Sequence, residues 1–316
     1  MNRNLLTHSA FFLAIAFCLT SWASPPLALA LGLALALTLG NPYPQRTQTA
    51  SKWLLQGCVV LLGFGMNLAV VLKAGASGAA FAAGSITLTF ALGYWLKGRL
   101  QINRTTSALI SAGTAICGGS AIAAVGSVVG AAEGEMTVAM GTVFVLNAVA
   151  LFVFPPIGHA LGLTQTQFGT WAGVAIHDVS SVVGAASRYG PSALQTATAV
   201  KLSRALWIVP VSALAALAFR RDAGPDHAPG KMHIPWFIGL FLLASVTRTL
   251  LPGVATLAPA LTHLATTGLS LTLFLIGAGL AREMLKSVGW KPMAQGVALW
   301  LCISAGSLWV ILRLVH

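Results

Sequence analysis

The chain has 316 residues, of which 57% are hydrophobic and only 8% are charged, and its mean hydropathy is +0.84. A soluble domain carries about 25% charged residues, so the composition excludes a water-soluble fold. The formal net charge of +12 would indicate nucleic-acid binding only if the basic residues clustered on one face. They stand instead at the ends of hydrophobic runs, so we expect the lipid bilayer as the surroundings and no nucleic-acid partner.

The hydrophobic residues form runs of roughly twenty, the length that crosses a ~30 Å hydrocarbon core. Backbone groups in lipid must be paired within a segment, so the runs are helices. The sequence predicts an all-α polytopic membrane protein, a single transmembrane domain over residues 1–316. The eleven predicted spans are 9–23, 25–41, 53–72, 77–97, 105–130, 135–157, 167–187, 193–219, 234–251, 261–281 and 292–314.

The first run also resembles a secretory signal, because Arg3 precedes a short apolar core that ends in "SWAS". Pro25 and Pro26 follow directly, and proline fits a cleavage site poorly. We therefore expect a retained helix. Basic residues gather in cytoplasmic loops. With the N-terminus in the cytoplasm, twelve basic residues fall on the inner side and Lys73, Arg188 and Arg313 on the outer. The inner set is Arg3, Arg46, Lys52, Lys97, Arg99, Arg104, Arg220, Arg221, Lys231, Arg282, Lys286 and Lys291.

Glycine-rich interruptions predict broken helices. The fifth span contains "GTAICGGS", which favours a break, and the tenth contains Gly277 and Gly279, where a break and close helix packing are both compatible with the sequence. If the first helix is an addition, residues 24–160 and 165–316 form two inverted five-helix repeats, with these spans fourth in each. Such a pair of broken helices points to a transporter site near the bilayer midplane. "GTAICGGS" also matches "GVAIHDVS" at an offset of 60 residues.

Asp178 is the one acidic residue of six that lies well inside a predicted span. A carboxylate there costs at least ~2.5–3.5 kcal/mol, so it normally faces a partner or a water-filled cavity. Lys201 and Arg204 lie one predicted helix away and three residues apart, on one helix face. One alternative is a buried ion pair that fixes helix register. The other is a net-positive interior that suits an anionic substrate.

The second alternative makes these charged residues part of a binding site together with the small residues of "GTAICGGS". His177 is either a proton-relay residue or a hydrogen-bonded packing residue. The candidate substrate-binding residues are Thr114, Cys117, Gly118, Gly119, Ser120, His177, Asp178, Ser181, Lys201 and Arg204. The four cysteines have no paired spacing, so neither a disulfide nor a metal site is expected, and no cofactor.

Three segments carry a resemblance: "GTAICGGSAIAA", "WAGVAIHDVSSVVGAA" and "TATAVKLSRALWIVP". They are similar to the signature segments of the YeiH family of bacterial inner-membrane proteins, whose suggested activity is sulfate export. The resemblance covers nearly the whole chain. It implies membership of the superfamily of cation/proton antiporters and bile-acid symporters, with inverted five-helix repeats and two crossing broken helices.

We expect a secondary transporter of the bacterial inner membrane for a small anion, sulfate among the candidates, with H⁺ or Na⁺ as coupling ion and a homodimer compatible with the sequence. The rival interpretation is a cation/proton antiporter that uses Asp178. A membrane enzyme built on His177, Asp178 and Ser181 is disfavoured, because adjacent residues diverge on a helix and cannot form a catalytic triad. A channel lacks the charged ring or repeated filter that would support it.

Overall fold

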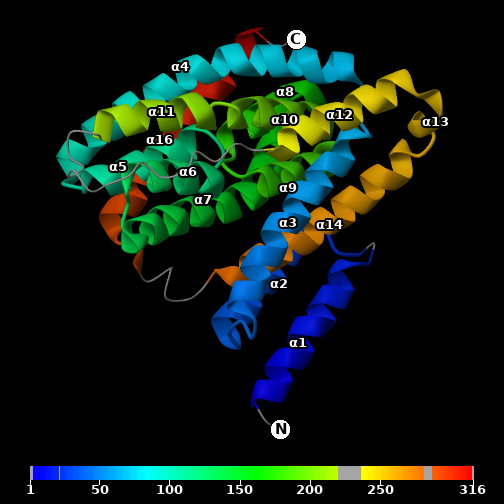
Figure 1. The fold of residues 1–316 in the computed structure, drawn as a ribbon, viewed down its shortest axis with the longest axis horizontal. Coiled ribbons are helices and arrows are strands. Elements are labelled where there is room, and N and C mark those ends of the chain that lie inside the picture. Colours follow the sequence, from blue (N-terminus) through cyan, green and yellow to red (C-terminus); the bar gives the residue numbers. More distant parts are fainter. Residues whose placement is uncertain (1–2, 21, 220–235, 281–286, 315–316) are drawn as a thin grey trace.

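The computed structural model describes residues 3–20, 22–219, 236–280 and 287–314. All regular secondary structure in these ranges is helical, as the composition predicts (Figure 1). The basic residues expected at Arg220, Arg221, Lys231, Arg282 and Lys286 lie outside the described ranges.

The helices are α1 (Arg3–Cys18), α2 (Pro25–Thr38), α3 (Pro44–Gly63), α4 (Leu68–Leu100), α5 (Arg104–Ala115), α6 (Gly119–Val129), α7 (Glu133–Ala160), α8 (Gln165–Ala175), α9 (Val179–Tyr189), α10 (Pro191–Ala205), α11 (Ile208–Phe219), α12 (Trp236–Leu250), α13 (Pro252–Ala255), α14 (Ala258–Gly279) and α16 (Trp290–Leu314).

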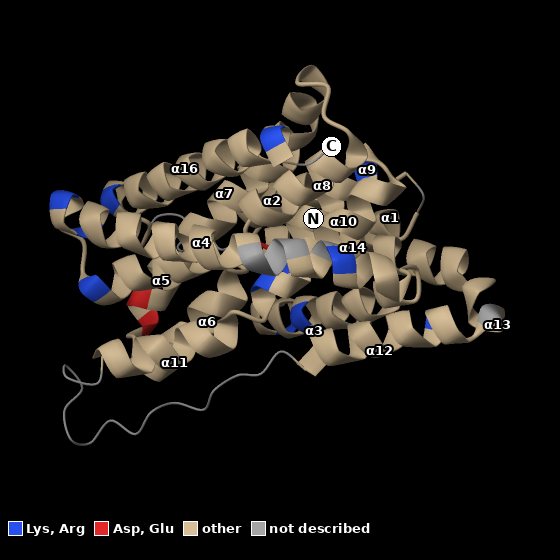
Figure 2. Cartoon of the chain, turned by 90° about the horizontal axis from the view of Figure 1, so that it is seen from above, with Lys and Arg blue, Asp and Glu red and all other residues tan. Residues whose placement is uncertain are grey.

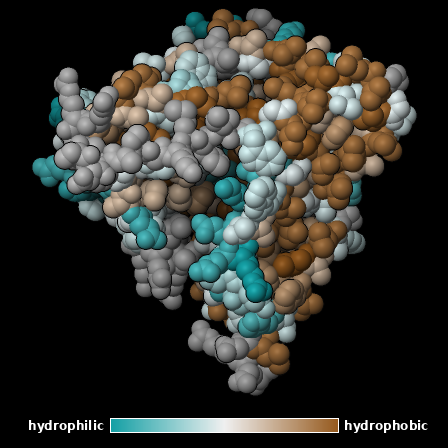
Figure 3. All heavy atoms as spheres, viewed as in Figure 1, coloured by the Kyte–Doolittle hydropathy of each residue, from teal (hydrophilic) through white to brown (hydrophobic). Residues whose placement is uncertain are grey.

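Within the described ranges, four helical stretches are long and apolar enough to cross a membrane: Glu133–Ala160, Pro191–Phe219, Ala258–Gly279 and Trp290–Leu314. Shorter apolar helices accompany them at Leu5–Cys18, Pro25–Thr38, Gly119–Val129 and Trp236–Leu250. Hydrophobic residues also cover much of the surface over α12, α13 and α14 (Figure 3). The chain is therefore a helical membrane protein with several apolar spans.

The helices divide into two groups that pack mainly within themselves (Figure 1). In the first, α2 and α3 pack along α14, and α12 packs on α3. We call α1–α3 and α12–α14 the panel bundle. We call the remaining helices, α4–α11 and α16, the hairpin bundle. The two bundles meet where α9 packs against α14 and α2, and where α4 touches α12.

The first predicted run forms α1, which packs on the panel bundle. Phe11 lies against Phe274 of α14 with 5.6 Å between the ring centroids, and Cys18 is fully buried. This segment is therefore part of the packed structure described here.

Short polar residues set where several helices begin. The side chain of Asn103 accepts a hydrogen bond from the Thr105 N–H at 2.8 Å at the start of α5. Thr164 and Gln167 form a reciprocal capping box at the start of α8. Such caps stabilise a helix by ~1 kcal/mol, because they satisfy N–H groups that have no partner within the helix.

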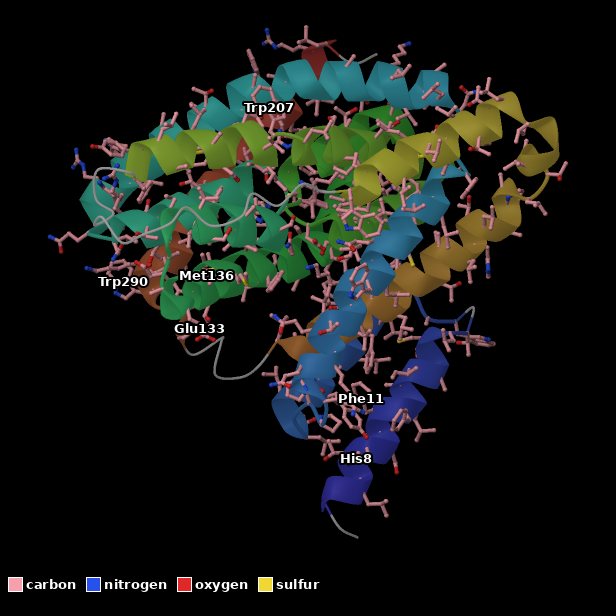
Figure 4. The ribbon with its side chains drawn as sticks, viewed as in Figure 1. His8, Phe11, Glu133, Met136, Trp207 and Trp290 are labelled. Carbon is pink, nitrogen blue, oxygen red and sulfur yellow. The ribbon has the colours of Figure 1, made fainter. Side chains whose placement is uncertain are left out.

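Charged residues gather at one end of the hairpin bundle. Figure 2 shows basic residues where α4 ends, α5 begins and α16 begins, with acidic residues nearby. Lys97 and Arg99 lie in the last turn of α4, and Glu133 and Glu135 lie in the first turn of α7. Figure 4 places Glu133, Met136 and Trp290 at this same end. The opposite end carries fewer charges.

Candidate functional site: two hairpin tips that meet inside the bundle

The fifth predicted span is broken at "GTAICGGS", as the glycine pattern predicts. α5 ends at Ala115 and α6 begins at Gly119. Gly118 adopts φ +70°, a conformation that glycine reaches without strain, and its N–H donates to the Gly113 carbonyl at 2.9 Å. A Cβ built on Gly113 would lie 3.0 Å from Cγ1 of Ile122, so α6 folds back along α5. The segment is a helical hairpin and not the crossing helix that we expected over 105–130.

The seventh predicted span forms a second hairpin, so the expectation of one continuous helix over 167–187 is wrong. α8 ends at Ala175, and Asp178 is the N-cap of α9. At the open end, the Ser192 N–H donates to Oε1 of Gln165 at 2.9 Å, and the Tyr189 hydroxyl donates to the Leu163 carbonyl at 2.7 Å. α9 therefore returns to where α8 began. The extended backbone that joins α8 to α9 has no glycine, which is why glycine content did not reveal it.

The tenth predicted span is not interrupted within the described residues, because α14 continues through Gly277 to Gly279. A Cβ on Gly277 would lie 2.6 Å from the Leu29 carbonyl oxygen and 2.9 Å from the Leu33 nitrogen. Gly277 thus permits close backbone packing between α14 and α2. The second broken segment is therefore the seventh predicted span. Its position follows from the 60-residue offset between "GTAICGGS" and "GVAIHDVS", and not from the two predicted five-helix repeats.

The two hairpins enter the bundle from opposite ends. α7 begins beside the first hairpin, where a Cβ on Gly126 would meet the Met136 sulfur at 2.9 Å. It ends beside the second, where His159 stacks on Tyr189 with 4.3 Å between ring centroids. α10 begins next to Gln165, and α11 ends where the Ala218 carbonyl accepts from Arg104. α7 and the α10–α11 segment therefore each run from the base of one hairpin to the base of the other.

The tips meet halfway along these segments. Asn147, near the middle of α7, accepts the N–H of His177 at 3.0 Å and the N–H of Asp178 at 3.2 Å through one side-chain oxygen. A Cβ on Gly118 would lie 3.6 Å from Cα and Cβ of Asp178. The break residues of the first hairpin thus contact those of the second, and α6 and α9 begin 60 residues apart.

Lys201 and Arg204 support the first tip. Lys201 Nζ donates to the Ile116 carbonyl at 3.2 Å, and Arg204 donates to the Ala115 carbonyl and, at 2.8 Å, to the Ser85 hydroxyl. These carbonyls belong to the C-terminal end of α5, which has unpaired acceptors and a partial negative charge. Both cations are fully buried. No sequence pattern indicated Ser85, which is one of many small residues in α4.

Asp178 is not ion-paired with these cations. One of its carboxylate oxygens accepts the Ser180 N–H at 3.0 Å, the Ser180 hydroxyl and, more weakly, the Ser181 N–H at 3.4 Å. The residue is partly exposed. The alternative of a buried ion pair that fixes register is therefore wrong for this structure, because each charge satisfies a helix end instead.

The first tip has no equivalent cap. Gly118 is the N-cap of α6 and supplies no side chain, so no N-cap side chain accepts a hydrogen bond from the first turn. The Ala121 N–H of that turn donates to the Gly118 carbonyl at 3.1 Å and lies close to the Cys117 sulfur. Ser120, in that turn, is exposed, and its hydroxyl donates to the Cys117 carbonyl at 3.2 Å and contacts the buried Cys117 sulfur at 2.8 Å. An uncapped helix N-terminus favours a bound anion.

Several buried polar groups around the tips have no hydrogen-bond partner within the described residues: the Thr114 hydroxyl, the Asn147 amide nitrogen, both ring nitrogens of His177 and Nε of Arg204. The His177 ring approaches the Val143 carbonyl without hydrogen-bonding geometry. A buried polar group without a partner costs ~1–3 kcal/mol, so such groups mark sites for water or a ligand. The Thr114 hydroxyl, the Asn147 amide nitrogen and Nε of Arg204 can each donate a hydrogen bond, and a neutral His177 ring adds one more N–H.

The two tips differ in accessibility. Along α6, Ser120, Ala123 and Ser127 are exposed and follow one helix face from the tip to the base. At the equivalent positions of α9, Ser180 and Val183 are buried and Ser187 is half-buried. The first hairpin is therefore exposed along this face of α6, whereas the second is buried or half-buried at the equivalent positions of α9. Of the predicted residues, Ser120 is exposed and Gly119 and Asp178 are partly exposed, whereas the others are buried: Thr114, Cys117, Gly118, His177, Ser181, Lys201 and Arg204.

With the site described, its relatives can be compared. A family model described as conserved hypothetical protein 698 matches residues 4–296. The chain belongs to this family. Its members include proteins named UPF0324 membrane protein, and it is the YeiH family that the three motifs indicate. No solved structure matches the chain.

The relatives cover nearly the full chain. A UPF0324 membrane protein of Bacteroides thetaiotaomicron is 51% identical over 292 residues, 92% of this chain and 86% of the relative. One from Porphyromonas gingivalis is 52% identical over 296 residues, 93% of this chain and 88% of the relative. One from Bdellovibrio bacteriovorus is 47% identical over 312 residues, 99% of this chain and 96% of the relative. All three names describe membrane proteins and give no activity.

Proposed function

We propose that this chain is a secondary transporter of a small anion in the bacterial inner membrane, working by alternating access without a cofactor and not as an enzyme. The observation that carries the proposal is the difference in exposure between Ser120 and Ser180, which occupy equivalent positions 60 residues apart. One site reached from one end only, between two similar elements that enter from opposite ends, is the arrangement that alternating access requires.

The choice of an anion rests on the surplus of donors and positive charge. Two buried cations and one carboxylate lie around the tips, α6 begins without a cap, and most unpartnered buried atoms can donate. Lys201 and Arg204 act indirectly in this proposal: they hold the end of α5 and add positive potential, while the first turn of α6 and Ser120 contact the substrate.

Access alternates when the hairpin bundle moves against the panel bundle. Their contact at α9 includes Gly184, whose Cβ would lie 2.9 Å from Pro25 and 3.0 Å from Leu273. A displacement of this contact would expose α9 and bury α6. The panel bundle would stay fixed, because glycines such as Gly277 let its helices pack backbone to backbone.

The charge pattern orients the protein with the N-terminus in the cytoplasm. Because each hairpin enters and leaves at one end, neither crosses, and the proposed topology has nine crossings instead of eleven. Lys97, Arg99, Arg104 and Lys291 then remain on the inner side, and the open end of the site faces the cytoplasm. The repeats proposed over 24–160 and 165–316 then hold one hairpin each.

A cation/proton antiporter is the second candidate. It is favoured by Asp178, which is partly exposed and uses one carboxylate oxygen for the α9 cap, so its second oxygen is available to H⁺ or Na⁺. Here Lys201 would only support the tip. The two candidates differ in which species crosses the membrane.

Reconstituted protein in proteoliposomes separates them. We expect uptake of one or more labelled small anions, sulfate included, that depends on an imposed pH or Na⁺ gradient. Movement of Na⁺ against H⁺ with no dependence on any anion would replace the anion proposal with the antiporter. Absence of transport of every anion and cation, in vesicles where a control transporter is active, would overturn both.

A further inference from the structure

A groove lies between α4 and α16 in the hairpin bundle. It has a volume of about 440 Å³. Its walls are six residues of α4 between Phe81 and Leu92 and seven residues of α16 between Leu299 and Val310. At one end, near Leu92 and Leu299, Gln295 of α16 donates to the Gly93 carbonyl of α4 at 3.4 Å and to the Ser107 hydroxyl of α5 at 2.7 Å.

Glycines create the space. Gly84 and Gly306 face the groove from opposite walls, and a Cβ on either would meet nothing within 4 Å. The wall residues of α16 from Leu299 to Val310 extend about 16 Å along the helix. The groove is therefore long and narrow, as an acyl chain requires.

The lining contains three hydroxyls, and each of them donates within its own helix. Ser85 donates to the Ala82 carbonyl, Thr89 to the Ser85 carbonyl and Ser307 to the Ser304 carbonyl, all within their own helices. Hydroxyls satisfied in this way do not call for a polar ligand. Since the other walls are apolar, hydrocarbon fills this groove better than water does.

The mouth of the groove carries a positive charge. Trp309 is a wall residue, and the guanidinium of Arg313 lies 4.6 Å from its ring centroid, one turn further along α16. Tryptophan and arginine at a helix end are the side chains that lie at the level of lipid headgroups. Arg313 is exposed and so is available to a phosphate.

We propose that this groove binds an anionic phospholipid of the bilayer, with an acyl chain between α4 and α16 and the phosphate at Arg313. This lipid site is separate from the contact between the two hairpin tips and does not depend on which substrate is transported. Ser85 links the two regions, because it lines the groove and accepts the hydrogen bond from Arg204.

Native mass spectrometry of the purified protein tests the site with phosphatidylglycerol and phosphatidylcholine as probes. We expect the parent to retain phosphatidylglycerol preferentially, Gly306→Leu to lose the bound lipid, and Arg313→Gln to bind phosphatidylglycerol about fivefold less, the effect of one basic residue near an anionic surface. Gly239→Leu is the matched control, because Gly239 is exposed on α12 with nothing within 4 Å. Equal retention by Gly306→Leu and parent would overturn the proposal.

Cys302 gives a second measurement, because it lines the groove and is exposed whereas Cys18, Cys58 and Cys117 are buried. We expect phosphatidylglycerol, but not soluble glycerol phosphate, to slow alkylation of Cys302 in detergent. Protection that rises with protein concentration and ignores lipid would assign the groove to a contact between two copies and refute the lipid site.

Discussion

Gly118 and Asp178 occupy equivalent positions at the two hairpin tips and contact each other, since a Cβ on Gly118 would lie 3.6 Å from Cβ of Asp178. Asp178 caps α9, whereas Gly118 leaves α6 without a side-chain cap. Two similar tips thus differ in electrostatics: one helix N-terminus is neutralised by the chain's own carboxylate, and the other is available to an external anion.

Replacing Asp178 with Asn separates its roles. Asn is as good an N-cap as Asp, so we expect the melting temperature in detergent to change little. Proton-coupled transport should lose its dependence on pH, because Asn has no carboxylate to carry a proton. Transport assays across a range of external pH measure this. An unchanged pH profile would remove Asp178 from the coupling mechanism, and loss of Na⁺/H⁺ exchange alone would favour the antiporter.

Arg204 should contribute to the stability of the protein through its two hydrogen bonds. Arg204 joins the Ala115 carbonyl to the Ser85 hydroxyl, and lysine cannot reproduce this two-sided contact. We expect Arg204→Lys to destabilise the protein by ~1–3 kcal/mol, while Ser85→Ala costs ~1 kcal/mol, because it removes one hydrogen bond. Thermal unfolding in detergent measures both. A variant Arg204→Lys as stable as the parent would contradict the supporting role.

Asn147 fixes the second tip to α7. Its side-chain oxygen accepts two buried backbone N–H groups, and Asn147→Ala leaves both without a partner. We expect a loss of ~2–3 kcal/mol for the pair. Asn147→Asp is the matched control, because it keeps the acceptor, so a larger loss of thermal stability in Ala than in Asp is expected. The reverse order would mean that the amide nitrogen, and not the oxygen, makes the important contact.

Composition was sufficient to predict a helical membrane protein, and the charges of Asp178, Lys201 and Arg204 were sufficient to predict which segments meet. The hairpins were not predictable from hydropathy, because two antiparallel half-helices such as α5 and α6 have the length and apolar content of one crossing helix. Glycine content revealed the first break but also pointed to Gly277, since glycine serves close packing as often as chain reversal.

Substitutions at Gly277 and Gly279 test whether these glycines serve close helix packing or a break in α14. A Cβ on Gly277 would collide with the backbone of α2, whereas one on Gly279 would meet nothing within 4 Å. We expect Gly277→Leu to lower expression and thermal stability strongly, since overpacking costs ~1–3 kcal/mol or more, and Gly279→Leu to behave like the parent. If the pair were instead a hinge, the two variants would fold equally well and both lose transport.

Ser120 offers the sharpest test of the proposed anion site. It is exposed in the first turn of α6, where a carboxylate stabilises the helix by interacting with the helix dipole. Ser120→Asp should therefore fold at least as well as the parent, yet bind the transported anion about tenfold or more weakly, because like charges repel across a few ångströms. Ser127→Asp places the same charge about two turns along the same exposed face and is the matched control, for which we expect a much smaller effect. Scintillation-proximity binding and proteoliposome uptake measure both. If Ser120→Asp and Ser127→Asp bind the anion equally, α6 is part of the access route but its N-terminus is not the binding site.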